Sequence, residues 1–119
     1  MDKIELGVYG EQMAVDHLLS LNFEVLERNF RWNRGEIDII CKSENEIRFI
    51  EVKTRETNRY GEPWESVSKS KQRQIIKVAH QYLIQNDIHL EARFDVVSIV
   101  ANSHHCAVQF IPDAFYPTH

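Results

Sequence analysis

Two acidic residues and one lysine lie close together in the two most strand-like segments of the chain. Asp38 lies in EIDIICK (36–42), and Glu51 and Lys53 lie in IRFIEVKT (47–54). Both segments are rich in Ile, Val and Phe, which favour β-strands. The four residues that separate them, 43–46, are an ordinary length for a hairpin loop. Closing that hairpin places Asp38 opposite Glu51 and on the same face as Lys53, with the two acidic Cβ atoms about 5 Å apart.

This arrangement predicts a site for a divalent cation. Two carboxylates paired across a covered hairpin repel each other and lose hydration unless a cation lies between them. Carboxylate oxygens without a neighbouring His or Cys favour Mg²⁺ or Mn²⁺ over zinc. Lys53 would then orient or deprotonate a water molecule, or stabilise negative charge on a phosphate. The same pattern also fits a plain cross-strand ion-pair network in which Lys53 neutralises Glu51, and the residues alone leave both interpretations open.

Strand alternation predicts which side chains share each face of the hairpin. Both faces carry mostly apolar residues, so we expect the hairpin to be central and covered on both sides. The face of Asp38, Glu51 and Lys53 also carries Ile40, Ile47 and Phe49, and the opposite face carries Ile37, Ile39, Arg48, Ile50 and Val52.

The rest of the chain supplies elements that would cover this hairpin. Apolar residues recur at helical spacing in 7–21 and in a segment that Ser68 or Ser70 would cap and that runs to about Asn86. Asn22 would end the first helix in a left-handed conformation. The further segments are strands at 23–29, 93–100 and 106–111 and a polar loop at 55–64. The order α-β-β-β-α-β-β predicts an α/β fold in which a three-strand meander is followed by a helical crossover to a parallel strand.

Length and composition restrict the class of protein. The 119 residues, 43% hydrophobic and 27% charged, predict a single globular domain and exclude a disordered or fibrous chain. No apolar run approaches the ~20 residues that cross a bilayer, and the N-terminal MDKIELG lacks an apolar signal core. We therefore expect a cytoplasmic protein that does not bind membranes. Cys41 and Cys106 are too few for a disulfide framework or a zinc site.

The net charge of −4 hides two basic segments. Residues 53–77 contain seven basic and three acidic side chains, which gives +4 and leaves −8 for the rest of the chain, and residues 28–34 contain three arginines and no acid. Local patches, rather than net charge, decide whether a polyanion binds. We expect nucleic acid as the partner, although basic residues at 71–77 also fit the solvated face of a surface helix. The candidate phosphate contacts are Arg31, Arg34, Arg55 and Lys71.

The order of these residues resembles a known nuclease fold. Asp38 followed by Glu51-Val52-Lys53 on the next strand is similar to the motif of the PD-(D/E)XK nucleases, whose restriction-endonuclease-like core is a mixed sheet flanked by helices. The Pro of that name is absent, because Arg34 precedes Gly35-Glu36-Ile37-Asp38. Over almost its full length the chain resembles, more narrowly, the YraN-like family of small bacterial proteins. The matching stretches are GxxGExxA (7–14), RN (28–29), GEIDII (35–40), FIEVKTR (49–55), GEP (61–63), Lys71, Ala79, YL (82–83), RFDVV (93–97) and AF (114–115).

The resemblance implies a metal-dependent phosphodiesterase fold related to the archaeal Holliday-junction resolvases. It implies an endonuclease-like protein that uses Mg²⁺ or Mn²⁺ on DNA in preference to RNA, with branched DNA as one candidate substrate. Asp38, Glu51 and Lys53 would be the catalytic residues. Related resolvases are dimers because they cut two strands symmetrically, so a homodimer is a further expectation. The alternative from another class is a non-catalytic nucleic-acid-binding or assembly module on the same fold.

The resemblance also selects Glu11 as a third metal ligand, together with Asp38 and Glu51. Gly7 and Gly10 would let the first helix approach the sheet closely and bring Glu11 over Asp38. A carboxylate favoured by the helix dipole is the simpler explanation of Glu11.

Several other residues have predicted roles. Glu36 shares the face of Asp38 and is either an outer ligand or a strand-entry residue. We expect Asp95 to be a structural partner for an arginine or a backbone amide, and Cys41 and Cys106 to pack as small apolar groups. Trp64 is a candidate for base stacking or for closing the edge of the core.

Overall fold

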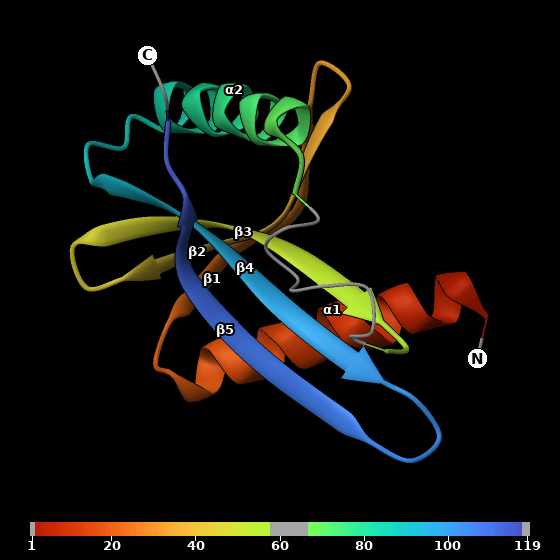
Figure 1. Cartoon of the computed structure of the whole chain (residues 1–119). Helices are drawn as coiled ribbons and strands as arrows, with labels where there is room; N and C mark the ends of the chain where they lie inside the picture. The colour runs from red at the N-terminus through yellow and green to blue at the C-terminus, as the bar shows by residue number, and fades with distance from the viewer. Residues whose placement is uncertain (1, 58–66, 118–119) are drawn as a thin grey trace.

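The central hairpin lies within a five-stranded sheet of order β1-β2-β3-β4-β5, and α1 and α2 lie on opposite faces of that sheet (Figure 1). This computed structural model describes residues 2–57 and 67–117. The mixed sheet flanked by helices and the order α-β-β-β-α-β-β are those predicted from the sequence. The elements are α1 (Lys3–Ser20), β1 (Glu24–Trp32), β2 (Gly35–Ser43), β3 (Glu46–Arg55), α2 (Lys69–Gln85), β4 (Glu91–Ala101) and β5 (Cys106–Phe115).

Polar caps fix the ends of both helices. The Asp2 side chain accepts a hydrogen bond from the Glu5 amide at 2.8 Å, so α1 begins about one turn earlier than the apolar spacing predicts. The predicted left-handed residue Asn22 follows α1 with a φ of 66°. Ser68, rather than Ser70, caps α2, because its hydroxyl accepts from the Lys71 amide at 3.1 Å. Neither helix in the described ranges is long and apolar enough to span a bilayer.

The strand pairing follows the predicted topology. Strands β1, β2 and β3 form an antiparallel meander, β3 and β4 are parallel, and β4 and β5 are antiparallel. The β2–β3 ladder pairs Lys42 with Ile47, as the hairpin loop predicts, and runs to the pair Ile39 and Ile50. Strand β1 continues beyond the predicted end at Asn29, because Phe30 still pairs with Ile37 although Asn29 has a φ of 53°.

Each helix covers its own apolar cluster. Ile40, Ile47 and Phe49 pack beneath α2, where Tyr82 lies edge-on to Phe49 with ring centroids 6.3 Å apart. Ile39 and Ile50 belong to the opposite cluster, beneath α1. Both assignments are those predicted from strand alternation, so the hairpin is central and covered on both sides.

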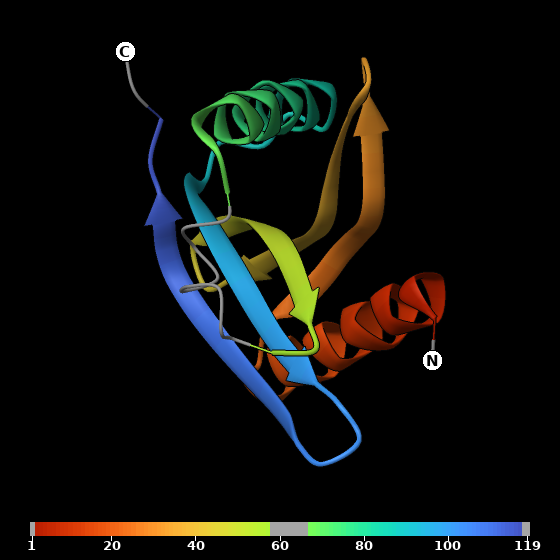
Figure 2. The ribbon, with the colours of Figure 1, turned by 45° about the vertical axis from the view of Figure 1, so that its right-hand side comes forward.

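Ile37 is a correction to that prediction. It belongs to the cluster beneath α2, whereas alternation places it with Ile39 beneath α1. The β2–β3 ladder ends at Ile39, and beyond it the β1–β2 ribbon bends away from β3 and rises beside α2 (Figure 2). Alternation assumes one continuous pleat, and this bend interrupts it.

Gly35 lets the bent hairpin approach α2. A Cβ at this position would lie 2.4 Å from Val78 Cγ2, a distance that a larger residue could not adopt without displacing the helix. Trp32 pairs with Gly35, and the two residues between them, Asn33 and Arg34, have φ values of 48° and 71°. These values are typical of a two-residue type I′ turn.

The secondary predictions have separate outcomes. Asp95 is fully buried and accepts from Arg48 Nη1 and from the Asp113 amide at 2.9 Å, which confirms its structural role. Cys41 is buried as predicted, but Cys106 is exposed, with its sulfur 3.3 Å from that of Met13. Trp64 lies outside the described residues, as does most of the predicted 55–64 loop.

Candidate active site

Asp38 lies where β2 and β3 separate. It is the first residue beyond the last β2–β3 pair, Ile39 and Ile50. Its Oδ2 atom accepts a hydrogen bond from the backbone amide of Val52 at 2.8 Å. The side chain thus takes the place that a backbone carbonyl would occupy in a continuing ladder. The divergence of the strands therefore brings the Asp38 carboxylate against β3 at the residue that follows Glu51.

Glu51 is buried and incompletely hydrogen-bonded. Only 8% of its surface is exposed, and its Oε2 atom has no hydrogen-bond partner within the part of the chain that the structure describes. Buried carboxylate oxygens are normally satisfied, because leaving one without a partner costs free energy. This oxygen marks a position where a ligand would restore the missing interaction.

The two carboxyl groups hold protons more tightly than free carboxyls do. Burial raises the pKa of Asp38 to about 7, and the charge of Glu51 contributes in the same direction. Burial also raises the pKa of Glu51, whereas Lys71, Lys53 and a hydrogen bond with Asp38 act to lower it. Without a bound cation, full ionisation of the pair is therefore unfavourable at neutral pH.

Two lysines from different elements act on this pair. Lys53 comes from β3, and Lys71 comes from the first turn of α2, and the charge of each favours the ionised form of Glu51. The sequence predicted Lys71 only as a phosphate contact. The crossover helix brings it to the candidate site, a proximity that no local spacing in the sequence indicates.

An open groove of about 450 Å³ gives access to Asp38 and Lys53 from the side of α1. We call it the carboxylate groove. It is also lined by Glu11, Glu36 and Asn29. The groove thus brings Glu11, Glu36 and Asp38 together with Lys53, whereas the predicted ligand Glu51 is not among its lining residues.

The position of Glu11 follows from one glycine. A Cβ on Gly10 would lie 2.0 Å from Thr54 Oγ1, whereas one on Gly7 would meet no described atom within 4 Å. The predicted close approach of α1 to the sheet therefore depends on Gly10 and not on Gly7. Glu11 Oε1 accepts from Arg28 Nε at 3.1 Å and from Asn29 Nδ2 at 3.0 Å.

Asn29 is the site residue that the sequence did not single out for a role. It lies in β1, lines the carboxylate groove and orients Glu11. Its left-handed backbone, with φ at 53°, suits asparagine better than most residues. An asparagine inside a strand-like run is the sequence signal by which Asn29 could have been identified.

The donor set fits Mg²⁺ or Mn²⁺. Asp38 and Glu51 supply hard oxygen ligands, and the buried Glu51 Oε2 has no described partner to displace. Among residues 2–57 and 67–117, no group of three His, Cys, Asp or Glu side chains has the arrangement of a metal site. Mg²⁺ is commonly held by one or two carboxylates together with water and substrate phosphates, so two carboxylates suffice, and Glu11 would lie at the rim.

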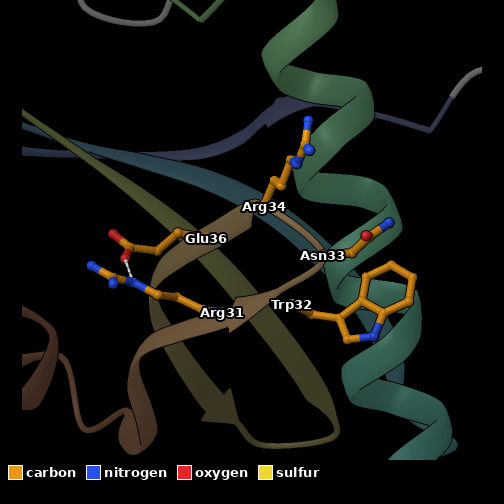
Figure 3. Close-up of a pocket in the computed structure, with 6 residues that line it drawn as sticks. Arg31, Trp32, Asn33, Arg34 and Glu36 are labelled. Atoms are coloured by element: carbon orange, nitrogen blue, oxygen red, sulfur yellow. Dashed lines mark hydrogen bonds and ion pairs between the residues drawn. The ribbon is translucent and has the colours of Figure 1, made fainter.

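The remaining candidate phosphate contacts are spread around this site. Arg31 is 79% exposed and pairs with Glu36 at 2.5 Å, and Arg34 projects from the hairpin turn (Figure 3). Arg55 ends β3 and lines a neighbouring groove with Lys3, Leu6 and Thr54. Of these four basic residues, Lys71 is the one whose charge acts to lower the pKa of Glu51.

The fold and the site define an α/β protein with a five-stranded mixed sheet and a carboxylate–lysine cluster where its second and third strands separate. Residues 10–99, which include all of this cluster, match the family described as "Uncharacterised protein family UPF0102". The chain belongs to this family, which agrees with the YraN-like resemblance of its sequence.

Similar proteins of this family occur in several bacteria, and each is named a UPF0102 protein. One from Christiangramia forsetii is 37% identical over 112 residues, 94% of either chain. One from Clostridium botulinum is 44% identical over 115 residues, covering 93% of this chain and 94% of the relative. One from Clostridioides difficile is 47% identical over 100 residues, covering 83% and 88%.

Proposed function

We propose that this protein is a metal-dependent endonuclease that hydrolyses phosphodiester bonds of nucleic acid. The observation that carries this proposal is the buried Glu51 Oε2, which has no partner among the described residues and lies beside a second carboxyl whose pKa is raised. Such a pair is costly on its own and becomes favourable when a divalent cation binds it. The resemblance to the resolvases favours DNA over RNA and allows branched DNA and a homodimer.

Each residue of the cluster has a distinct task in this proposal. Asp38 and Glu51 would hold Mg²⁺ or Mn²⁺, with Glu11 at the rim of the groove. When bound, the ion would offset the charge of the scissile phosphate and lower the pKa of a water molecule. Lys53 would orient the attacking water and stabilise negative charge on the phosphate. Lys71 would keep Glu51 ionised.

The charges of the cluster suit a phosphodiester substrate. With both carboxyls ionised, Asp38 and Glu51 balance Lys53 and Lys71. A divalent cation then makes the cluster positive, and a phosphodiester anion in the groove, which carries one negative charge, would offset part of that charge. The cluster would therefore bind metal and substrate together more readily than either one alone.

The test is cleavage of purified duplex, branched and single-stranded DNA and RNA with Mg²⁺, Mn²⁺ or EDTA. We expect metal-dependent cleavage of at least one substrate, and loss of it in Asp38→Ala, Glu51→Ala and Lys53→Ala. Lys42→Ala, which removes an exposed lysine of β2, is the matched control and should cut normally. Cleavage that survives the three site substitutions would refute the assigned site.

A second candidate function is a non-catalytic nucleic-acid-binding or assembly module. The observation in its favour is that Arg28 and Asn29 already engage Glu11, so the described residues do not assemble a three-carboxylate site. This module would bind polynucleotides with or without Mg²⁺ and cut none of them. The same substrate panel, read by binding as well as by cleavage, separates the two functions.

A further inference from the structure

The fold brings parts of the two basic segments, the hairpin tip of the first and helix α2 of the second, into contact. Gln74 of α2 donates to the carbonyl of Arg34 at 3.4 Å, and Gly35 approaches Val78 closely. The tip of the β1–β2 hairpin, residues 31–36, therefore lies against α2. Helix α2 contains four basic residues and no acid, and three of them, Lys69, Arg73 and Lys77, are exposed.

Trp32 lies in this surface and is partly exposed. In the folded protein, 39% of its surface is exposed to solvent. It is on the same face of β1 as Phe30, whose ring packs edge-on to Tyr82 of α2 with centroids 5.0 Å apart. In Figure 3, Trp32 extends to one side of the hairpin, and Arg31 and Glu36 extend to the other. A hairpin tip that carries an aromatic ring and two arginines offers both a stacking surface and phosphate contacts.

The hairpin tip is held in place before any partner binds. Its type I′ turn is closed by the pair Trp32 and Gly35, and α2 supports it at Gln74 and Val78. A preorganised aromatic side chain loses little conformational freedom on binding. The tip is thus built as a rigid contact surface.

The hairpin tip is continuous with the carboxylate groove. Residues 31–36 line a cavity of about 540 Å³, and Glu36 lines both this cavity and the groove that contains Asp38. A strand lying over the tip would therefore extend toward Asp38 and Lys53.

We propose that Trp32 stacks on an unpaired base of a nucleic-acid strand whose phosphates contact the basic surface of the hairpin tip and α2. Bases in a continuous duplex stack on one another and must be unstacked before a side chain can replace a neighbour. The partner is therefore a single strand, or a single-stranded segment of a larger substrate. The stacking on Trp32 is independent of the proposed function; only the path of the strand into the carboxylate groove rests on it.

The test uses Trp32 fluorescence in EDTA, so that no substrate is cut. A Trp64→Phe background leaves Trp32 as the sole tryptophan of the chain. The probes are an oligothymidine, an abasic oligonucleotide of equal length and charge, and a blunt duplex. We expect the oligothymidine to quench Trp32 and to bind more tightly than the abasic probe. The Trp32 variants lack this signal, so their affinities are measured by the anisotropy of dye-labelled probes. Because the ring is already partly covered, Trp32→Ala should weaken oligothymidine binding by about five- to tenfold.

Two variants make this experiment decisive. Trp32→Phe should restore most of the oligothymidine affinity, because phenylalanine also stacks. Arg73→Ala should weaken all three probes to a similar degree, since it removes a phosphate contact only. Abasic binding by Trp32→Ala at the wild-type level shows that this variant is folded.

The inference is overturned if the ratio of oligothymidine affinity to abasic-probe affinity is the same for Trp32→Ala as for the wild type. It is also overturned if no probe binds. Its failure is separate from that of the endonuclease proposal. Base-dependent quenching without cleavage in Mg²⁺ or Mn²⁺ would refute the enzyme and support Trp32. Metal-dependent cleavage, together with a ratio of oligothymidine to abasic affinity that Trp32→Ala leaves unchanged, would support the enzyme and refute the role of Trp32.

Discussion

Replacing Asp38 with asparagine should stabilise the metal-free protein at neutral and alkaline pH. The substitution removes one of two poorly hydrated like charges and keeps an oxygen that can accept from the Val52 amide, as Oδ2 does at 2.8 Å. The new amide group can also donate to Glu51, whose Oε2 has no described partner. A residue in a plain salt-bridge network would give the opposite result, because its charge would be lost without compensation.

The size of the effect follows from the pKa of Asp38. Burial, together with the charge of Glu51, raises this pKa from 3.8 to about 7. Since the folded state holds the proton more tightly than the unfolded state, stability is retained below about pH 4 and falls as pH rises toward 7. The full shift corresponds to about 4 kcal/mol of lost stability above pH 7. Because Glu51 is coupled to Asp38, we expect asparagine to recover about half, roughly 2 kcal/mol or 8 °C in Tm.

The assay is thermal unfolding of both proteins in EDTA from about pH 4.5 to 8, repeated with Mn²⁺. The advantage of Asp38→Asn should be small at the acidic end and grow with pH. Saturating Mn²⁺ should raise the Tm of the wild type by mass action and that of Asp38→Asn much less. Under these conditions the wild type gains most where its metal-free form is least stable.

Asp95→Asn, in strand β4 of the same sheet, is the matched control. Asp95 is fully buried like the core around it, but its carboxylate accepts from Arg48 Nη1 at 3.1 Å and from the Asp113 amide. Removing its charge takes the closer of two carboxylate partners from the largely buried Arg48, which also pairs with Glu46 at 3.5 Å. This loss should lower the free energy of unfolding, and Mn²⁺ should add nothing specific. If Asp38→Asn also melts below the wild type at pH 8, and Mn²⁺ shifts neither protein, the metal-site hypothesis is wrong.

Three further predictions concern catalysis, packing and binding. Lys53→Ala should lose cleavage yet keep the Mn²⁺-dependent rise in Tm, since lysine is not a ligand; loss of both would make Lys53 structural. Gly10→Ala should lower the free energy of unfolding in urea by about 1–3 kcal/mol, because its Cβ would meet Thr54 Oγ1 at 2.0 Å. Gly7→Ala should be neutral or stabilise by up to about 1 kcal/mol, and equal losses at the two glycines would contradict the close approach at Gly10. Lys71→Ala combined with Arg73→Ala should flatten the dependence of log K on log salt by roughly one unit per lost phosphate contact, and an unchanged slope would exclude both side chains from the interface.

The sequence predicted the parts of the fold that local rules determine. The register of the β2–β3 hairpin follows from its loop length and from the period-two pattern, so Lys42 pairs with Ile47 as expected. Ser68 begins α2 through its side-chain cap, and Asn22 follows the end of α1 in a left-handed conformation; both effects act within a few positions of the sequence. The same rules predicted Asp38 opposite Glu51; the ladder ends one pair earlier, at Ile39 and Ile50, and the two carboxyl groups nevertheless lie close enough to interact.

What the sequence could not predict depends on bending and on contacts across layers. Alternation placed Ile37 on the wrong face, because nothing local shows that the β2–β3 ladder ends at Ile39. The charge of Lys71 lowers the pKa of Glu51 because α2 packs over the sheet. The two residues belong to different elements of the crossover, so no local pattern in the sequence shows that they interact. The approach of Trp32 and Arg34 to α2 likewise depends on Gly35, whose lack of a side chain is visible in the sequence but whose neighbour Val78 is not.

The buried Asp95 and the half-buried Asp38, on different strands of one sheet, show why the carboxylate pair points to a ligand. Asp95 is satisfied by Arg48 and a backbone amide, and Arg48 in turn contacts Ser43 and two aromatic rings. This is how a buried charge is accommodated when its role is structural. Asp38 and Glu51 lie in the same protein, yet the described residues leave one of their oxygens without a hydrogen bond. Among the described residues, Glu51 thus keeps an unsatisfied buried oxygen where Asp95 keeps none, and in the proposed function a divalent cation would supply the interaction that this oxygen lacks.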